Sequence, residues 1–265
     1  MKLKDKFEQL KRQNEIANII YLTAGYPTVE DFEKILTQIS DYGADIIEIG
    51  VPFSDPTADG KTIQYSSYIA LQNKTNLEYI FNLLKKIKLN IPVVLMSYLN
   101  PLINYNKGDF SSDYLFKKIK EVNIAGIIIP DLPIGLQNNV LYTQLSDKIK
   151  KYDIDNILLA TLTTSEERLR TIATETKGFL YCVSVTGTTG VRNDISEKTI
   201  NFLKKVRTYT NKPIALGFGI SKPEHVEKIK NFSDGVIIGS RIIDAISNEE
   251  DLEKIIKKFK NATRR

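Results

Sequence analysis

An acidic residue inside an apolar run is the first candidate for chemistry in this sequence. Glu48 lies within residues 45–49, a short β-branched run that predicts a buried β-strand. Side chains alternate between the two faces of a strand, so Glu48 is expected to point away from Ile47 and Ile49 and into an interior. Burial would raise its pKa towards the range that suits a general acid or base. A structural carboxylate paired with a buried polar group is an equal alternative at this point.

Two more acidic residues, Asp55 and Asp59, follow in the loop 52–60 between prolines and a glycine. Asp is common in turns, where its side chain bonds to the nearby backbone, and this alone would explain both residues. The position of Glu48 directly upstream favours a second interpretation. A loop stiffened by Pro and Gly could hold one of these carboxylates above Glu48, which predicts a catalytic pair.

Three glycine-bearing turns predict a site for a phosphate group. They span residues 186–190, 217–221 and 239–240, and the last two lead into helices. Glycine lets backbone N–H groups approach an anion closely, and a helix N-terminus complements its charge. None of the three segments contains Lys, so the phosphate would be bound mainly through backbone N–H groups.

Four aromatic residues, Tyr21, Phe53, Tyr98 and Tyr181, lie at or near the ends of predicted strands. They could line a pocket for a planar aromatic group. An ordinary role in the core or at its rim is equally compatible with the sequence.

The chain contains one His and one Cys, which narrows the possible chemistry. A metal site of His and Cys, a Ser-His-Asp triad and a Cys-His dyad are nearly excluded. Cys182 lies in an apolar run and is predicted to be a core residue. His225 begins a predicted surface helix and is expected to have no chemical role. Acid–base chemistry is therefore left to Asp, Glu, Lys or Tyr.

The elements that must position these residues alternate between short apolar runs and amphipathic stretches. Eight predicted strands cover residues 18–23, 45–49, 92–97, 124–129, 156–160, 178–184, 213–216 and 235–238. Helical periodicity follows them at residues 29–42, 77–88, 113–122, 136–152, 165–174, 196–210, 222–230 and 251–260. This alternation predicts a single (β/α)8 barrel, a TIM barrel of the α/β class, over residues 1–265. An extra N-terminal helix is expected to end near Arg12.

The longest connections are residues 50–76, 98–112 and 185–195, the enlarged βα loops after the second, third and sixth strands. In a barrel all three emerge at the carboxyl ends of the strands, where active sites lie. A doubly wound open sheet is the alternative fold, but the first strand lacks the Gly-rich turn of its nucleotide-binding members.

The 265 residues carry 37 Lys and Arg against 32 Asp and Glu, a net charge of +5. Most of the cations are Lys, which predicts a solvated exterior rather than a nucleic-acid surface. No apolar run approaches the roughly 20 residues that span a bilayer, and the first residues lack the apolar segment of a secretory signal. We therefore expect a soluble, intracellular protein that binds neither nucleic acid nor a membrane.

Residues 48–60, read as Glu-Ile-Gly-Val-Pro-Phe-Ser-Asp-Pro-Thr-Ala-Asp-Gly, resemble the signature of the tryptophan synthase α-subunit family. Further motifs of that family occur in order over almost the whole chain. They are Thr23-Ala24-Gly25-Tyr26-Pro27, Tyr98-Leu99-Asn100-Pro101, Asp131-Leu132-Pro133, Gly217-Phe218-Gly219-Ile220-Ser221 and Ile238-Gly239-Ser240.

The resemblance implies a lyase of L-tryptophan biosynthesis that splits indole-3-glycerol phosphate, by a retro-aldol reaction, into indole and glyceraldehyde 3-phosphate. By motif position, Glu48 corresponds to the proton shuttle and Asp59 to the carboxylate that accepts the indole N–H. Thr189 corresponds to the residue that orients this aspartate when the sixth loop closes. The other implied substrate-binding residues are Tyr21, Tyr98 and Tyr181 around the substrate and Gly190, Gly219, Gly239 and Ser240 at the phosphate. The resemblance implies no metal and no organic cofactor in this chain.

The family acts as an αββα complex, in which indole passes through a tunnel to a β subunit that carries pyridoxal phosphate. The positions that match the surface facing this partner are Asp55, Pro56, Asn100 and Pro101. Departures from the family pattern at Thr57, Lys61, residues 134–136 and Thr188 leave partner affinity and loop closure open.

Two other functions stay open at this level. One is a stand-alone lyase with the same chemistry and no partner. The other is a phosphate-binding barrel without catalysis, against which the retention of both Glu48 and Asp59 argues. The expected compartment is the cytoplasm for a bacterial protein and the plastid stroma for a plastid-encoded one.

Overall fold

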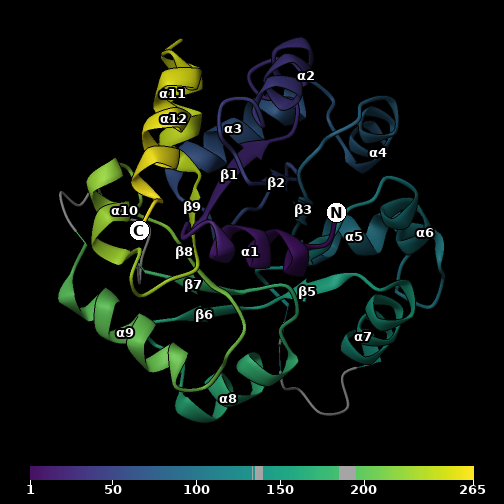
Figure 1. Cartoon of the computed structure of the whole chain (residues 1–265). Helices are drawn as coiled ribbons and strands as arrows, with labels where there is room; N and C mark the ends of the chain where they lie inside the picture. Colours follow the sequence, from purple (N-terminus) through teal and green to yellow (C-terminus); the bar gives the residue numbers. More distant parts are fainter. Residues whose placement is uncertain (133, 135–139, 185–194) are drawn as a thin grey trace.

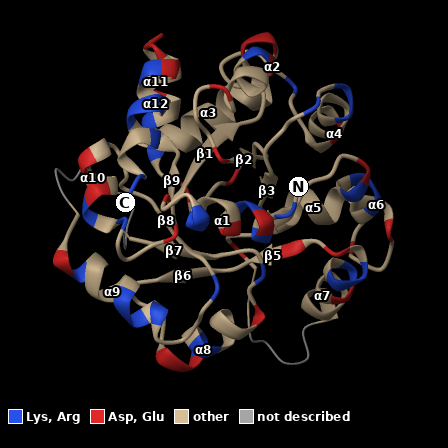
Figure 2. Cartoon of the chain, viewed as in Figure 1, with Lys and Arg blue, Asp and Glu red and all other residues tan. Residues whose placement is uncertain are grey.

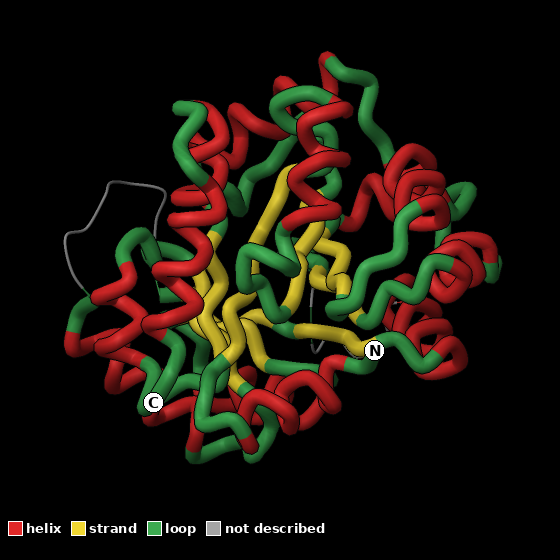
Figure 3. The backbone as a smooth tube through the Cα atoms, turned by 45° about the horizontal axis from the view of Figure 1, so that its top comes forward, coloured by secondary structure: helices red, strands yellow, loops and turns green. Residues whose placement is uncertain are grey.

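The strands of this protein form a nearly closed parallel barrel with helices around it (Figure 1, Figure 3). The computed structural model describes residues 1–132, 134, 140–184 and 195–265. Neighbouring strands follow the order β5-β4-β3-β2-β1-β9-β8-β7-β6. The strands are β1 (Ala17–Thr23), β2 (Ile46–Gly50), β3 (Val93–Met96), β4 (Gly126–Ile128), β5 (Asp155–Ile157), β6 (Leu159–Thr161), β7 (Leu180–Val183), β8 (Ile214–Gly217) and β9 (Gly235–Ile238).

The fifth barrel strand of the prediction, residues 156–160, is divided in two. β5 pairs with β4, and β6 pairs with β7, on either side of Leu158. The N–H of Leu158 is hydrogen-bonded to the Thr176 side chain at 3.1 Å and not to a neighbouring strand. β5 and β6 are the two edge strands of the sheet, and only Leu158 separates them in the chain. The two edges therefore lie close together, and the barrel is nearly closed.

The helices surround the strands, as the amphipathic stretches predict. They are α1 (Leu3–Arg12), α2 (Val29–Gln38), α3 (Lys61–Gln72), α4 (Leu77–Lys86), α5 (Leu99–Tyr105), α6 (Tyr114–Glu121), α7 (Val140–Tyr152), α8 (Glu166–Glu175), α9 (Glu197–Arg207), α10 (Pro223–Ile229), α11 (Ser240–Ser247) and α12 (Leu252–Ala262). The enlarged loops after the second and third strands therefore contain α3 and α5. The sixth loop, apart from Ile195, lies outside the described residues.

Helix α1 covers the amino ends of the strands, in the centre of the view in Figure 1. Leu3 is fully buried, and the ring of Phe7 lies 5.7 Å from that of Phe179, which directly precedes β7. This confirms the extra N-terminal helix. Since α1 covers the amino end, we expect a functional site at the opposite, carboxyl end.

The strands are mostly apolar because both of their faces are covered. All seven residues of β1 are buried. Parallel pairing sets Tyr21 of β1 beside Glu48 of β2, and Glu48 beside Val94 of β3. The sheet register therefore fixes the place of Glu48 relative to the neighbouring strands.

Charged residues of both signs are interspersed on the outer helices (Figure 2). No single face gathers the Lys and Arg residues in this view, in agreement with the prediction of a solvated exterior. Among the helices that the structure describes, none has the length and apolar character to span a bilayer.

Candidate active site

Glu48 is a buried carboxyl in the middle of β2, with 1% of its surface exposed. Its Oε2 atom has no hydrogen-bond partner in the described part of the chain. Burial, and then the negative charge of Asp59, raise the pKa of Glu48 to about 8. The carboxyl is therefore mostly protonated at neutral pH, with a free oxygen for a reacting group. The alternative of a structural pair with a buried polar group has no support among the described residues.

Asp59 is held by the loop that follows β2. It is 7% exposed, and its Oδ2 accepts a hydrogen bond of 2.9 Å from the Tyr98 hydroxyl. The same hydroxyl accepts the N–H of Ala58 at 2.9 Å, so Tyr98 fixes both the loop and the carboxylate. Burial raises the pKa of Asp59 to about 6, and the hydrogen bond from Tyr98 opposes this rise. Asp59 is thus mostly ionised at pH 7, unlike Glu48.

Tyr21 and Tyr181 are buried beside this pair of carboxyl groups. Burial and the charges of Glu48 and Asp59 raise the pKa of the Tyr181 hydroxyl. Each ring lies against a glycine: a Cβ on Gly50 would be 2.1 Å from the Tyr21 hydroxyl. A Cβ on Gly217 would be 2.3 Å from that of Tyr181. The strand-end glycines therefore make room for the two tyrosines.

The turns after β8 and β9 leave the barrel side by side. Ala215 of β8 pairs with Gly235 of β9. Gly219 comes four residues after Ala215, and Gly239 comes four residues after Gly235. Gly219 has a φ of +84°, which favours glycine, and Gly239 caps the N-terminus of α11. The backbone N–H groups of Gly219, Ile220, Gly239 and Ser240 have no acceptor among the described residues. They form a set of donors that suits an anion.

The motif and its geometry agree with comparisons to known proteins. The family model described as "Tryptophan synthase alpha chain" matches residues 7–265. The chain belongs to the tryptophan synthase alpha chain family. A tryptophan synthase alpha chain of Prochlorococcus marinus is 41% identical over 96% of this chain and 88% of its own length. One of Methanocaldococcus jannaschii is 42% identical, with 97% and 89% covered. One of Arabidopsis thaliana is 36% identical, with 99% and 93% covered.

Solved structures agree with this family assignment. A Mycobacterium tuberculosis tryptophan synthase chain superposes with a TM-score of 0.89 at 27% identity, over 99% of this chain and 98% of its own. An Aquifex aeolicus protein superposes with a TM-score of 0.88 at 34% identity, over 100% of both chains. The TIM-barrel prediction and the suspected family are both confirmed.

The positions predicted to face a partner in this alpha chain family are accessible. Asp55 and Asn100 are exposed, and Pro56 and Pro101 are half-buried. Asp55 and Pro56 lie in the loop after β2 that also holds Asp59. Asn100 and Pro101 follow β3 and Tyr98. Both segments therefore lie at the carboxyl ends of strands.

Other residues of the family site fall outside the described part. Thr189 and Gly190, with the departure at Thr188, belong to the undescribed segment 185–194, and so does most of the sixth loop. Their predicted roles stay predictions. Among the described residues, no group of His, Cys, Asp and Glu suited to a metal ion occurs.

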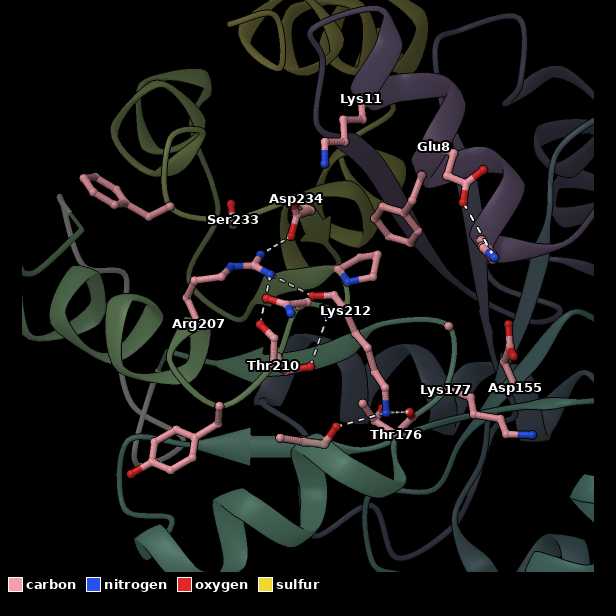
Figure 4. A pocket seen from close by; sticks show the side chains of 18 of the residues that line it. Glu8, Lys11, Asp155, Thr176, Lys177, Arg207, Thr210, Lys212, Ser233 and Asp234 are labelled. Carbon is pink, nitrogen blue, oxygen red and sulfur yellow. Dashed lines mark hydrogen bonds and ion pairs between the residues drawn. The ribbon is translucent and has the colours of Figure 1, made fainter.

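A cavity of about 1340 Å³ lies at the opposite, amino end of the barrel, between α1 and the starts of β7, β8 and β9 (Figure 4). Two of its charged groups, those of Arg207 and Lys212, have partners within the protein. Arg207 forms an ion pair with Asp234, and the ammonium of Lys212 donates to the backbone carbonyls of Ala173, Thr174 and Thr176. The Lys212 contacts satisfy carbonyls at the C-terminus of α8, so we assign this end to stability rather than catalysis.

The sequence did not indicate several contacts that organise the alpha chain site. The Gln64 side chain donates to the Asp59 carbonyl at 2.8 Å, and the Leu99 N–H donates to Asp131 at 2.9 Å. Cys182 is fully buried, as predicted. His225 lies in α10 (Pro223–Ile229), the predicted surface helix, but its side chain is on the inner face and is 2% exposed. Helix α10 has only seven residues, too few for periodicity to show which face His225 takes.

Proposed function

We propose that the carboxyl end of this barrel cleaves indole-3-glycerol phosphate into indole and D-glyceraldehyde 3-phosphate. The family assignment makes the chain a carbon–carbon lyase of tryptophan biosynthesis. The observation that carries the residue-level proposal is the buried pair of carboxyl groups: Glu48 protonated and without a partner among the described residues, and Asp59 ionised near it. We also propose that residues 1–265 act as one catalytic domain.

Substrate binding would use both sides of the barrel mouth. The N–H groups of Gly219, Gly239 and Ser240 would bind the phosphate, together with Gly190 of the undescribed loop. The indole ring would lie among Tyr21, Tyr98 and Tyr181, with its N–H directed to Asp59. Anchoring of the phosphate and the ring at two separate places would orient the bond between them.

Glu48 would act first as an acid and then as a base. Its proton goes to C3 of the indole ring, which leaves a positive, iminium-like ring. The Glu48 carboxylate then takes the proton of the adjacent glycerol hydroxyl. The C–C bond breaks, its electron pair returns to the ring, and the aldehyde forms. Glu48 ends the cycle protonated, as it began, which fits its pKa of about 8.

Asp59 would stabilise the charge that develops in this step. Its carboxylate accepts the indole N–H and faces the positive ring. Because Tyr98 and the loop backbone hold the carboxylate in place before substrate binds, little reorganisation is needed during the reaction. Thr189 would orient Asp59 further when the sixth loop closes.

The chain would work with a β subunit in an α2β2 complex. Asp55, Pro56, Asn100 and Pro101 would contact this partner, which would carry the pyridoxal phosphate, while the alpha reaction itself uses only side chains and backbone N–H groups. These segments support the α2β2 proposal because Asp59 follows the first and Tyr98 precedes the second, so contact with the partner reaches the site directly. The compartment would be the bacterial cytoplasm or the plastid stroma.

An assay of indole release from indole-3-glycerol phosphate, with and without β subunit, tests this proposal. We expect indole and glyceraldehyde 3-phosphate in equal amounts and a higher rate with β. Equal rates with and without β would support a stand-alone lyase. Binding of the substrate without any indole release would support a non-catalytic phosphate-binding barrel.

A further inference from the structure

The turn between β8 and α10 has an unusual backbone. Both Phe218 and Gly219 have positive φ values, +63° and +84°. The left-handed region is unfavourable for a bulky residue such as Phe, so surrounding contacts must hold this turn in place. The turn is also the one that presents the free N–H groups of Gly219 and Ile220.

One ring atom of His225 lies close to two backbone groups of this turn. Nδ1 lies 3.3 Å from the backbone nitrogen of Ser221, which can donate to it. The same atom lies 3.1 Å from the carbonyl oxygen of Gly219. The ring is 2% exposed, and Nε2 has no hydrogen-bond partner in the described part of the chain.

Either neutral form of the ring can therefore hold the turn. With its proton on Nε2, His225 accepts the Ser221 N–H; with its proton on Nδ1, it donates to the Gly219 carbonyl. In both forms the Gly219 and Ile220 N–H groups are left free. The ring does not replace the ligand-binding donors but orients the peptide units that carry them.

We propose that His225 is a positioning residue for the phosphate group of the substrate, acting through the turn 218–221. This inference rests on the proposed function, since it takes the ligand of this turn to be a phosphate. The hydrogen bond that Nδ1 forms in either neutral form ties the turn to α10 in advance, which lowers the conformational cost of gathering the N–H donors around an anion. Loss of this bond should weaken binding of the phosphate more than binding of the indole ring.

Three variants separate hydrogen bonding from packing. His225→Leu fills a similar volume without any polar atom. His225→Asn places an amide atom where Nδ1 stands, one bond from Cγ, and so can hold the turn again. His225→Gln carries its amide one bond further, near the place of Nε2. Thermal unfolding of each variant shows whether it is folded.

The measurements are KM and kcat for indole-3-glycerol phosphate, the affinity for sn-glycerol 3-phosphate, and the affinity for indole. For His225→Leu we expect KM and the dissociation constant of glycerol 3-phosphate to rise about threefold to tenfold, the effect of one neutral hydrogen bond. Indole affinity and kcat should change less than about twofold, and His225→Asn should restore phosphate affinity. If His225→Leu does not fold, His225→Gln takes its place in the comparison.

Unchanged glycerol 3-phosphate affinity in His225→Leu, or in His225→Gln where it replaces that variant, would overturn the inference. So would a parallel loss of phosphate and indole binding, because this indicates a general structural role. A wild-type protein that releases no indole would overturn the proposed function and this inference with it. Normal wild-type activity with unchanged phosphate affinity in the variant overturns the inference alone.

Discussion

At the scale of single residues, the site separates two similar acids by their surroundings. Glu48 has no hydrogen-bond donor to its Oε2 among the described residues, and its pKa is raised to about 8. Asp59 accepts a hydrogen bond from Tyr98, and its pKa is raised only to about 6. At neutral pH one group can therefore donate a proton while the other remains a carboxylate, and the chemistry needs this division.

These pKa values predict a bell-shaped pH dependence of kcat/KM. Activity should fall below about pH 6 as Asp59 gains a proton, and above about pH 8 as Glu48 loses one. Tyr98→Phe removes the hydrogen bond that lowers the pKa of Asp59, so the acid limb should move to higher pH. A profile without limbs between pH 5 and 9 would contradict these assignments.

The burial of Glu48 should also reduce stability at neutral pH. The unfolded chain loses the Glu48 proton near 4.5, whereas the folded protein keeps it up to about 8. Between these values the native state binds more protons, so its stability falls as pH rises. At pH 7 the cost is about 3 kcal/mol as an upper estimate.

Glu48→Gln cannot ionise and avoids this cost. We expect its urea-unfolding free energy to exceed that of the wild type at pH 7.5, and the difference to shrink at pH 5. A difference that is the same at both pH values would show that the burial of Glu48 carries no ionisation cost.

At the scale of elements, the barrel strands position the site through close contacts at their carboxyl ends. Gly50, the last residue of β2, leaves space for the Tyr21 hydroxyl of β1. The Thr23 hydroxyl donates to the same Tyr21 oxygen at 3.3 Å. Strand register and these contacts place Tyr21 beside Glu48.

Gly50→Ala should therefore lower both stability and activity. Its Cβ would stand 2.1 Å from the Tyr21 oxygen, so the ring must move, and overpacking of this kind costs about 1–3 kcal/mol. Gly60→Ala is the matched control, because no atom lies within 4 Å of its Cβ. At the helix N-cap Ala is less favourable than Gly, so this control should cost about 0.5–1 kcal/mol. Equal urea-unfolding free energies for the two variants would contradict the role of Gly50.

Periodicity predicted most barrel elements because their apolar faces are continuous. It did not predict α3, whose buried face holds two serines, Ser66 and Ser67, besides Ile63 and Ala70. A buried face with small polar residues has no apolar stripe to recognise. Periodicity also predicted a single strand over residues 156–160, where the structure has β5 and β6. The break between them depends on a hydrogen bond from the Leu158 N–H to the distant Thr176.

At the scale of the whole molecule, the two ends of the barrel have different tasks. The amino end is covered by α1, and there Arg207 forms an ion pair with Asp234. The carboxyl end holds the carboxyl pair, the free N–H groups and the exposed loop positions Asp55 and Asn100. Partner contact and catalysis are therefore expected at the same end.

Asp55→Lys should reduce the rate enhancement that the β subunit gives, because it reverses the charge of an exposed residue in the proposed interface. Asp5→Lys makes the same change on α1 at the opposite end and serves as the control. The ratio of indole-release rates with and without β is the measurement. A ratio that falls equally in both variants, or in neither, would contradict the proposed interface.

The sequence predicted which end of the barrel holds the site better than it predicted the contacts within the site. The motif 48–60 and the strand alternation placed Glu48 inside the barrel. No sequence pattern showed that Tyr98 would hold both Asp59 and the Ala58 N–H, since these residues are far apart in the chain. The contacts of the His225 ring could not be predicted either, because its partners come from a turn whose backbone geometry local patterns do not reveal.

The most direct test of the central claim compares Glu48→Gln with the wild type in two assays on one protein preparation. Indole release from indole-3-glycerol phosphate measures the proton shuttle, and binding of sn-glycerol 3-phosphate measures the remaining site. We predict a loss of at least about 100-fold in kcat, the usual contribution of a general acid–base group, with glycerol 3-phosphate affinity unchanged within about twofold. Indole release at the wild-type rate by Glu48→Gln would contradict the mechanism.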